Sequence, residues 1–180
     1  MNFCSHCGQP VSLATPPGDH LPRYVCAACG TVHYQNPKLV VGCLCEWQDR
    51  VLLCRRAIEP RAGYWTLPAG FMENDETVEQ GAARETREEA LAEAVDLAPL
   101  ALVNVPHVNQ VHLMFRAGLR EGRFGAGTET LEAALVAEAD IPWVDIAFPS
   151  VRFALERFFE DRRRGEFGFH LHTWRKPAAG

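Results

Sequence analysis

The sequence predicts an α/β fold with a small metal-binding module in front of it. Apolar, β-rich residues 38–47 and 51–55 flank a short polar turn, which indicates a hairpin. A capped, glutamate-rich helix is expected from about residue 78, and a second amphipathic helix follows residue 150. Two short cysteine motifs lie within residues 1–35. We therefore expect one larger domain and one small appendage.

The composition is that of a soluble globular protein. The 180 residues are 47% hydrophobic and 23% charged, and no segment is apolar for long enough to cross a membrane. The formal charge of −5 argues against a nucleic-acid-binding surface. The N-terminus has no signal-peptide pattern, and the seven cysteines are an odd number. We therefore expect a cytoplasmic protein that uses cysteine for metal binding rather than for disulfides.

Residues 1–35 hold two CxxCG motifs, Cys4–Cys7 and Cys26–Cys29, which are eighteen residues apart. Four thiolates suit a closed tetrahedral zinc site, and the glycine after each pair lets the chain fold around the metal. A segment this short cannot bury a core, so zinc would supply the missing folding energy. A redox pair is the alternative, but no βαβ pattern surrounds either motif. We predict a structural zinc ribbon with the ligands Cys4, Cys7, Cys26 and Cys29.

The glutamate-rich helix begins with a capping box, Thr77 to Gln80, and nothing is expected to break it before residue 93. Three of its glutamates stand on one face, where like charges repel; they are Glu85, Glu88 and Glu89. A hard divalent cation such as Mg²⁺ would turn that repulsion into a binding site. The alternative is a solvated acidic face with Arg84 and Arg87 as its partners.

The glutamates belong to a longer pattern, which reads Gly70, five residues, Glu76, seven residues, Arg84-Glu85, two residues, Glu88-Glu89. This pattern resembles the Nudix box, G-x5-E-x7-R-E-U-x-E-E-x-G-U, where U is a bulky aliphatic residue. Two positions depart from it: Thr86 occupies the first aliphatic position, and Leu91 occupies the final glycine position. Because that glycine normally ends the helix with a positive φ, we expect this helix to run on through Leu91.

The resemblance implies a Nudix α/β/α sandwich with a mixed sheet over residues 36–165, between the zinc ribbon and a C-terminal tail at 166–180. The chain is also similar to a zinc-ribbon Nudix group that includes the plant plastid FAD pyrophosphatase. The matching stretches are YQNPKLVVGCL, LLCRRAIEPRAGYWTLPAGF and the box. That group implies FAD or ADP-ribose as substrate, cut to AMP plus FMN or ribose 5-phosphate. In the tail, His170-x-His172 is a metal-binding candidate, and a disordered or interface tail is the alternative.

The resemblance also implies how the site is built. Mg²⁺ or Mn²⁺ would be held by the three clustered glutamates and by the carbonyl of Ala69, just before the box, and would act on a small-molecule nucleotide. Arg84 would hold a neighbouring glutamate in position, and Glu76 would anchor the loop or a metal-bound water. A further carboxylate is expected from a late loop, as a metal ligand or base, and its candidates are Glu129 and Glu132.

Several other residues allow two interpretations. Arg55 and Arg56 either meet substrate phosphates or remain surface charge. A polar cluster between two predicted strands is either a substrate-contacting loop or a polar turn; it comprises His107, Asn109, Gln110 and His112. Three further cysteines are either reactive thiols or buried core residues; they are Cys43, Cys45 and Cys54. Ser150 is predicted to cap the last helix.

Two other functions are alternatives to the hydrolysis of FAD or ADP-ribose. NADH pyrophosphatases, which also act on NAD-capped RNA, likewise join a zinc ribbon to a Nudix domain. Their SQPWPFPxS signature is echoed here only by Phe148-Pro149-Ser150. A ligand-sensing or RNA-binding module without activity would also keep the box, although the intact glutamates and the acidic balance argue against it. A homodimer is left open.

Overall fold

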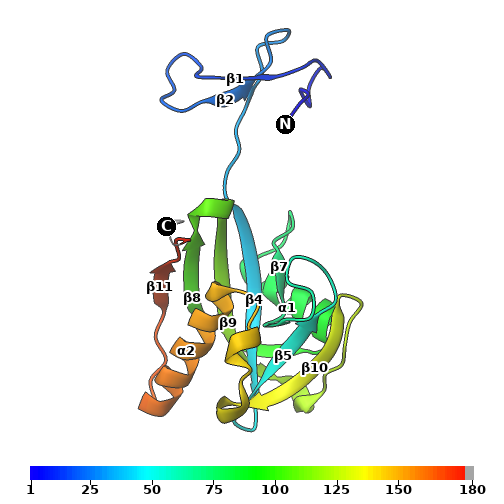
Figure 1. The fold of residues 1–180 in the computed structure, drawn as a ribbon, viewed down its shortest axis with the longest axis vertical. Coiled ribbons are helices and arrows are strands. Elements are labelled where there is room, and N and C mark those ends of the chain that lie inside the picture. Colours follow the sequence, from blue (N-terminus) through cyan, green and yellow to red (C-terminus); the bar gives the residue numbers. More distant parts are fainter. Residues whose placement is uncertain (177–180) are drawn as a thin grey trace. The chain divides into compact units, whose positions relative to one another are not determined.

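The computed structural model describes residues 1–176, which form two compact units, Met1–Pro37 and the chain from Lys38 onward. The first unit contains a three-stranded antiparallel sheet (Figure 1). Its strands, in sheet order, are β1 (Ser12–Ala14), β2 (Arg23–Val25) and β3 (Val32–His33). Gly8 and Gly30, which follow the two cysteine pairs, have φ of 74° and 73°. Glycine is therefore needed where the chain turns back after each CxxC motif, and each of these turns is here called a knuckle.

The second unit is built on a mixed sheet of eight strands (Figure 1). Its main path is β10-β5-β4-β9-β8-β11, while β6 pairs with β5 and β7 pairs with β4. The pairs β4–β9 and β8–β11 are parallel, and the other pairs are antiparallel. The strands are β4 (Lys38–Trp47), β5 (Arg50–Arg56), β6 (Trp65–Thr66), β7 (Ala69–Phe71), β8 (Ala94–Val105), β9 (Gln110–Leu119), β10 (Thr130–Ala137) and β11 (His170–Thr173).

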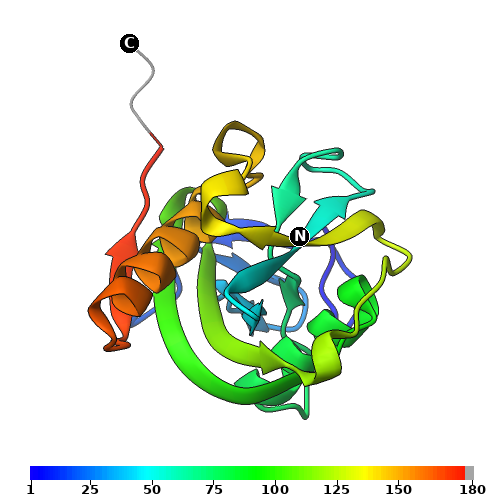
Figure 2. The same cartoon turned by 90° about the horizontal axis from the view of Figure 1, so that it is seen from below.

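Two helices, α1 (Val78–Ala90) and α2 (Pro149–Arg164), cover the two faces of this sheet (Figure 2). Alternation along β4 explains the arrangement, because Cys43 and Cys45 pack in the same cluster as Ala82 of α1, whereas Leu44 packs with α2. The predicted α/β/α sandwich is therefore confirmed. The three cysteines outside the knuckles, Cys43, Cys45 and Cys54, are buried core residues.

Short 3₁₀ helices fill the connections of the second unit. They are η1 (Pro106–Val108), η2 (Arg120–Gly122), η3 (Glu138–Asp140) and η4 (Trp143–Asp145). Within residues 1–176, neither α1 nor α2 has the length and apolar character of a membrane-crossing helix.

The end of α1 differs from the prediction. The helix stops at Ala90, and Leu91 adopts the left-handed conformation with φ 47° and ψ 35°. Gly125 N–H donates to the Ala90 carbonyl at 2.7 Å, and Gly127 N–H donates to the Glu89 carbonyl at 3.0 Å. These bonds satisfy the last carbonyls and offset the cost of a left-handed leucine, about 1–2 kcal/mol. The expectation that the helix runs on through Leu91 is wrong because a glycine-rich loop caps it.

The start of α2 also differs. The first helical residue is Pro149, and Phe148 is the N-cap. Ser150 lies inside the first turn, where its hydroxyl is 2.8 Å from His112 Nδ1, so the prediction that Ser150 caps the helix is wrong. Proline suits this first position because its φ is already helical and it lacks an N–H. At the other end, Gly165 terminates α2 with φ 74°.

The described part of the segment after α2, residues 165–176, is not disordered as the alternative prediction had it; residues 177–180 of the predicted tail lie outside the described residues. Residues 170–173 form β11, which pairs in parallel with Ala101 to Asn104 of β8. His170 contacts Asp161, and His172 stacks on Phe153, so both histidines have structural partners. Neither belongs to a cluster of metal-ligand type in the described chain. This pairing links residues about seventy positions apart, which local sequence patterns do not reveal.

We predict that Gly127→Ala destabilises the second unit. A methyl group at residue 127 would overlap the Glu88 carbonyl of α1, and a backbone atom cannot move aside as a flexible side chain can. The free energy of unfolding should fall by roughly 2 kcal/mol. Gly168→Ala is the control, because a Cβ there meets only His170 ring atoms at 3.8 Å. Urea denaturation that gives the two variants equal stability would contradict the close approach.

Candidate functional site

Two glutamates of α1 are buried against the sheet. Glu85 is 9% exposed and Glu89 is 8% exposed, whereas Glu88 is exposed to solvent. Glu89 Oε2 accepts a 3.0 Å hydrogen bond from Ala69 N–H on β7. Beside it, a Cβ at Gly70 would overlap the Glu85 carboxylate, so glycine leaves the space that this carboxylate occupies. The bare backbone of β7 therefore lets α1 bring two carboxylates down to the sheet.

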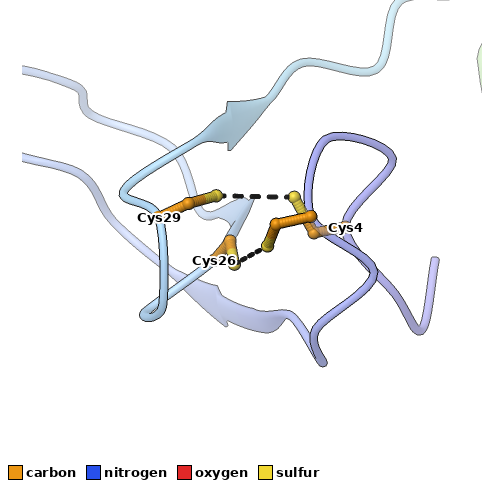
Figure 3. A group of neighbouring side chains, drawn as sticks. Cys4, Cys26 and Cys29 are labelled. Atoms are coloured by element: carbon orange, nitrogen blue, oxygen red, sulfur yellow. Dashed lines mark hydrogen bonds between the residues drawn. The ribbon is translucent and has the colours of Figure 1, made fainter.

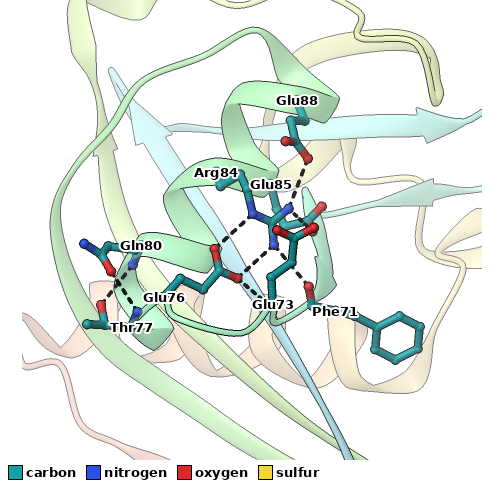
Figure 4. Close-up of polar contacts among 8 residues, drawn as sticks. All are labelled: Phe71, Glu73, Glu76, Thr77, Gln80, Arg84, Glu85 and Glu88. Carbon is teal, nitrogen blue, oxygen red and sulfur yellow. Dashed lines mark hydrogen bonds and ion pairs between the residues drawn. The ribbon is translucent and has the colours of Figure 1, made fainter.

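Arg84 connects the carboxylates around it (Figure 4). Its Nη1 donates to Glu85 Oε1 at 2.7 Å and to Glu88 Oε2 at 3.1 Å. Its Nε and Nη2 donate to the two Glu76 oxygens at 3.0 and 2.9 Å. Nη2 also donates to the Phe71 carbonyl at 3.1 Å. The guanidinium thus fixes the orientation of three carboxylates at once, which suits its planar array of donors.

Glu76 ties the loop before α1 to Arg84. Its Oε1 accepts a 2.7 Å hydrogen bond from Glu73 N–H. Arg84, followed by that N–H, lowers the pKa of Glu76 to about 2, so this carboxylate stays ionised. A Cβ at Gly81 would lie 2.7 Å from Glu76 Oε1. Glycine at this position inside α1 leaves the space for this contact.

Burial shapes the electrostatics of the site. It raises the pKa of Glu89 to about 7, against the opposing effect of the Ala69 N–H, and nearby Glu85 and Glu129 add to the rise. Burial also raises the pKa of Glu85, although Arg84 opposes it. The ion pairs of the cluster all use Arg84 and leave Glu89 without a cationic partner within residues 1–176. A buried carboxylate without an ion-pair partner, such as Glu89, fits a hard divalent cation.

These carboxylates face a cavity of about 860 Å³ in the second unit. This volume lies in the usual range for small-molecule sites. Six of the residues that the sequence assigned to metal binding or catalysis line the cavity: Ala69, Arg84, Glu85, Glu88, Glu89 and Glu129. Glu76 is not in the lining and reaches the cluster only through Arg84. Glu132 is also outside the lining, and its Oε2 lies 3.9 Å from Arg55 Nη1. Of the two late carboxylates, only Glu129 reaches the cavity.

The four knuckle cysteines come together in the first unit, and Figure 3 labels three of them, Cys4, Cys26 and Cys29. All four Sγ atoms lie within 4.8 Å of one another, with Cys4–Cys29 at 3.7 Å and Cys7–Cys26 at 3.5 Å. A tetrahedral zinc with Zn–S bonds of about 2.3 Å requires sulfur separations near about 3.8 Å, so the cluster fits this metal. Outside the four ligands, His33 Nε2 lies 3.2 Å from Cys4 Sγ, within hydrogen-bonding reach.

Family comparison agrees with both units. The family model described as Nudix N-terminal, a zinc ribbon, matches residues 2–35, and the NUDIX domain model matches residues 36–152. This chain belongs to the Nudix family. The sequence prediction of a Nudix domain preceded by a zinc ribbon is therefore confirmed.

Relatives of this Nudix protein include a crystal structure and curated hydrolases. A NUDIX hydrolase from Nitrosomonas europaea is 52% identical, with a TM-score of 0.94 over 98% of this chain and 100% of that one. The NAD-capped RNA hydrolase NudC of Stutzerimonas stutzeri is 31% identical over 89% of this chain and 56% of its own length. An ADP-ribose pyrophosphatase from Methanocaldococcus jannaschii is 39% identical over 31% of this chain and 33% of its own. The chain spans about half the length of the NudC relatives.

The structure places relative to the wall of the Nudix cavity two groups of residues for which the sequence allowed two interpretations each. Arg56 lines the cavity, whereas Arg55 donates from Nε to the Gly63 carbonyl at 2.9 Å and is outside the lining. In the polar cluster, His107, Gln110 and His112 line the cavity, and Asn109 does not.

His112 is a buried, neutral part of that wall. Its Nδ1 lies 2.8 Å from Ser150 Oγ, and its Nε2 lies 2.9 Å from Gln110 Oε1. Burial lowers the pKa of His112 to about 4, so the ring carries no charge at neutral pH. Sequence reasoning did not connect Ser150 with His112 because they meet only when α2 packs on β9.

Apolar and aromatic residues complete the lining, and the sequence analysis assigned none of them to the site, although it noted Phe148 in a partial signature. Phe148 precedes α2 and stacks under the Arg56 guanidinium at 5.1 Å, while Ile58 follows β5. Trp174 follows β11 and also lines the cavity. A motif search could not find Trp174, because only the pairing of β11 with β8 brings it there.

We expect native protein to contain about one zinc per chain, the stoichiometry of a single Cys₄ site. Cys26→Ser removes a buried ligand and should abolish stoichiometric zinc, and the first unit should unfold with it. Cys54→Ala is the control, because Cys54 lies outside the cluster and its loss should leave the zinc content unchanged. Metal analysis by mass spectrometry decides: zinc-free wild type, or full zinc in Cys26→Ser, would refute the assignment.

Proposed function

We propose that this protein hydrolyses the diphosphate linkage of a nucleoside diphosphate joined to another moiety, in a reaction that depends on Mg²⁺ or Mn²⁺. The observation that carries the proposal is the placement of the Nudix-box carboxylates. Glu85 and Glu89 are buried at the wall of an 860 Å³ cavity, and Arg84 is bonded to the carboxylates beside it. Carboxylates and substrate phosphates are both negatively charged, so this cluster can bind a polyanionic substrate only when a cation lies between the carboxylates and the phosphates.

The preferred substrate of the proposal is a nicotinamide dinucleotide, either free NADH or the NAD cap of an RNA. Its support is the similarity to NAD-capped RNA hydrolases, which extends over 89% of this chain in one relative. The sequence analysis favoured FAD or ADP-ribose, and the corresponding match to an ADP-ribose pyrophosphatase covers only 31% of the chain. The NudC relatives are named as hydrolases of NAD-capped RNA. The formal charge of −5 is therefore not a reason to exclude RNA as a partner of this protein.

In this proposal Glu85, Glu88 and Glu89 hold the cation, with the Ala69 carbonyl as the further donor implied by the family. The bound cation would neutralise diphosphate charge and lower the pKa of an attacking water. Arg84 keeps Glu85 and Glu88 oriented, and the Ala69 N–H keeps Glu89 oriented.

Glu129 faces the same cavity and is the remaining candidate for a further ligand or for the base. During hydrolysis the water oxygen joins one phosphorus, and the bond from that phosphorus to the bridging oxygen breaks. The water gives up its proton to the base, and two phosphate-bearing products leave.

A hydrolysis screen tests the proposal. NADH, NAD-capped RNA, FAD, ADP-ribose and nucleoside triphosphates are offered with Mg²⁺ or Mn²⁺, and products are separated by chromatography. We expect cleavage at the diphosphate, with NADH or capped RNA giving the highest kcat/KM. Faster turnover of FAD or ADP-ribose would restore the preference inferred from the sequence. Nucleotide binding without hydrolysis of any compound would instead indicate a sensing module.

Glu89→Gln provides the matched test of the site. It keeps an acceptor for the Ala69 N–H but removes a charge and a metal ligand, so kcat should fall roughly 100- to 1000-fold. Glu132→Gln is the control, since Glu132 lies outside the cavity and its loss should leave turnover within roughly twofold of wild type. If both variants turn over like wild type, the acidic face of α1 is not the catalytic site.

A further inference from the structure

The segment that follows α2, Gly165 to Trp174, is here called the C-terminal strap. Gly165 ends α2, and the strap then runs back along the sheet as β11 beside β8, which both views show (Figure 1, Figure 2). The family model stops at residue 152, before the strap begins. The strap also contains the two histidines that the proposed function has not used.

Side-chain and backbone contacts fix the strap in place. Asp161, which is 3% exposed, accepts Gly168 N–H at 3.0 Å and lies 2.7 Å from His170 Nε2. The His172 ring stacks on Phe153 with 4.6 Å between centroids and an angle of 16°. Through these contacts, His170 and His172 attach the strap to α2. They hold the parallel pairing of β11 with β8 from the α2 side.

The last anchored residue of the strap is Trp174. The backbone N–H of Trp174 donates to the Asn104 carbonyl at 2.9 Å, and this bond continues the pairing with β8 by one residue. Asn104 Nδ2 also donates to Thr173 Oγ1 at 3.2 Å. Trp174 is therefore held at a defined position, although the strap lies at the edge of the sheet.

The Trp174 side chain lines the same cavity as the α1 glutamates. It is half-buried and meets the His107 ring edge-to-face, with 4.8 Å between centroids and an angle of 61°. An edge-to-face contact covers at most one face of either ring, so the pair keeps aromatic surface for a further ring. Val105 and Val108 line the cavity in the same region, which makes this part apolar. Diphosphate groups belong at the carboxylate cluster, whereas planar rings bind aromatic and apolar walls.

We propose that the C-terminal strap is part of the substrate site and that Trp174, with His107, binds a planar ring of the dinucleotide substrate. This inference rests on the proposed function and specifies how the substrate is recognised. The ring is either the adenine shared by all the candidate substrates or the nicotinamide or flavin ring that ADP-ribose lacks. The cavity volume of about 860 Å³ accommodates a ligand larger than a diphosphate.

Steady-state kinetics of Trp174→Ala with NADH, FAD and ADP-ribose test the inference. Loss of one stacking partner should raise KM roughly tenfold, while kcat changes little, because the carboxylate cluster is untouched. Trp174→Phe should retain most of the affinity, since it preserves a ring. A KM increase for all three substrates places adenine on Trp174, and an increase confined to NADH and FAD places the second ring there.

Leu171→Ala is the matched control on the same strap. Leu171 is 70% exposed and is not in the cavity lining, so its loss should leave KM unchanged. Thermal unfolding of each variant shows whether the fold is retained. If Trp174→Ala has the same KM values as Leu171→Ala for all three substrates, the inference is wrong.

Fluorescence gives a readout that does not need turnover. The chain has four tryptophans, so AMP or nicotinamide mononucleotide stacking on Trp174 should quench part of the wild-type emission. Trp174→Phe should lose that part of the quenching. If wild type hydrolyses none of the dinucleotides, the proposed function fails, and this titration still tests ring binding. Equal quenching in wild type and Trp174→Phe would overturn the role of Trp174.

Discussion

The site depends on the burial of carboxylates beside a single arginine. Arg84 neutralises Glu76 and contacts Glu85 and Glu88, but its donors do not reach Glu89. Glu89 therefore has one backbone N–H as its hydrogen-bond partner, and burial raises its pKa to about 7 although the Ala69 N–H and the charge of Arg56 oppose the rise. Ionised Glu89 opposes folding, and a bound cation would relieve that cost, in agreement with the metal site that we propose here.

Glycines make this arrangement sterically feasible. The lack of a side chain at Gly70 leaves space for the Glu85 carboxylate, and at Gly81 it leaves space for Glu76. At Gly127 it lets a loop approach the end of α1. The same loop caps α1 through Gly125 and Gly127, which allows Leu91 to turn the chain without the usual glycine. The cysteine cluster belongs to the other unit, and all four of its cysteines lie in Met1–Pro37. Zinc bound there would supply folding energy to a segment that lacks a core of its own.

Much of the fold and of the site could be predicted from local patterns. The capping box at Thr77 marks the start of α1, and the alternation of β4 follows from its apolar run. Helical spacing alone places Glu85 and Glu89 one turn apart on a shared face, and both are buried in α1. What could not be predicted depends on contacts distant in sequence. The Gly125–Gly127 cap, the Ser150–His112 contact and the pairing of β11 with β8 join segments that no short motif links.

The most direct test of the account compares the unfolding of wild type and Glu89→Gln by urea without added Mg²⁺, across pH. All four tryptophans follow residue 38, so their fluorescence reports the second unit. The pKa of Glu89 rises from 4.5 to about 7 on folding, so both proteins should be equally stable at acid pH, where the carboxyl is protonated. As the pH rises from about 4.5 to about 7, wild type should lose stability relative to the variant, and the loss should level off above that range, at on the order of 2 kcal/mol by about pH 8; added Mg²⁺ should close the gap. A difference that does not change with pH, or a less stable variant at about pH 8, would contradict the claim that Glu89 is buried at a cost which a cation relieves.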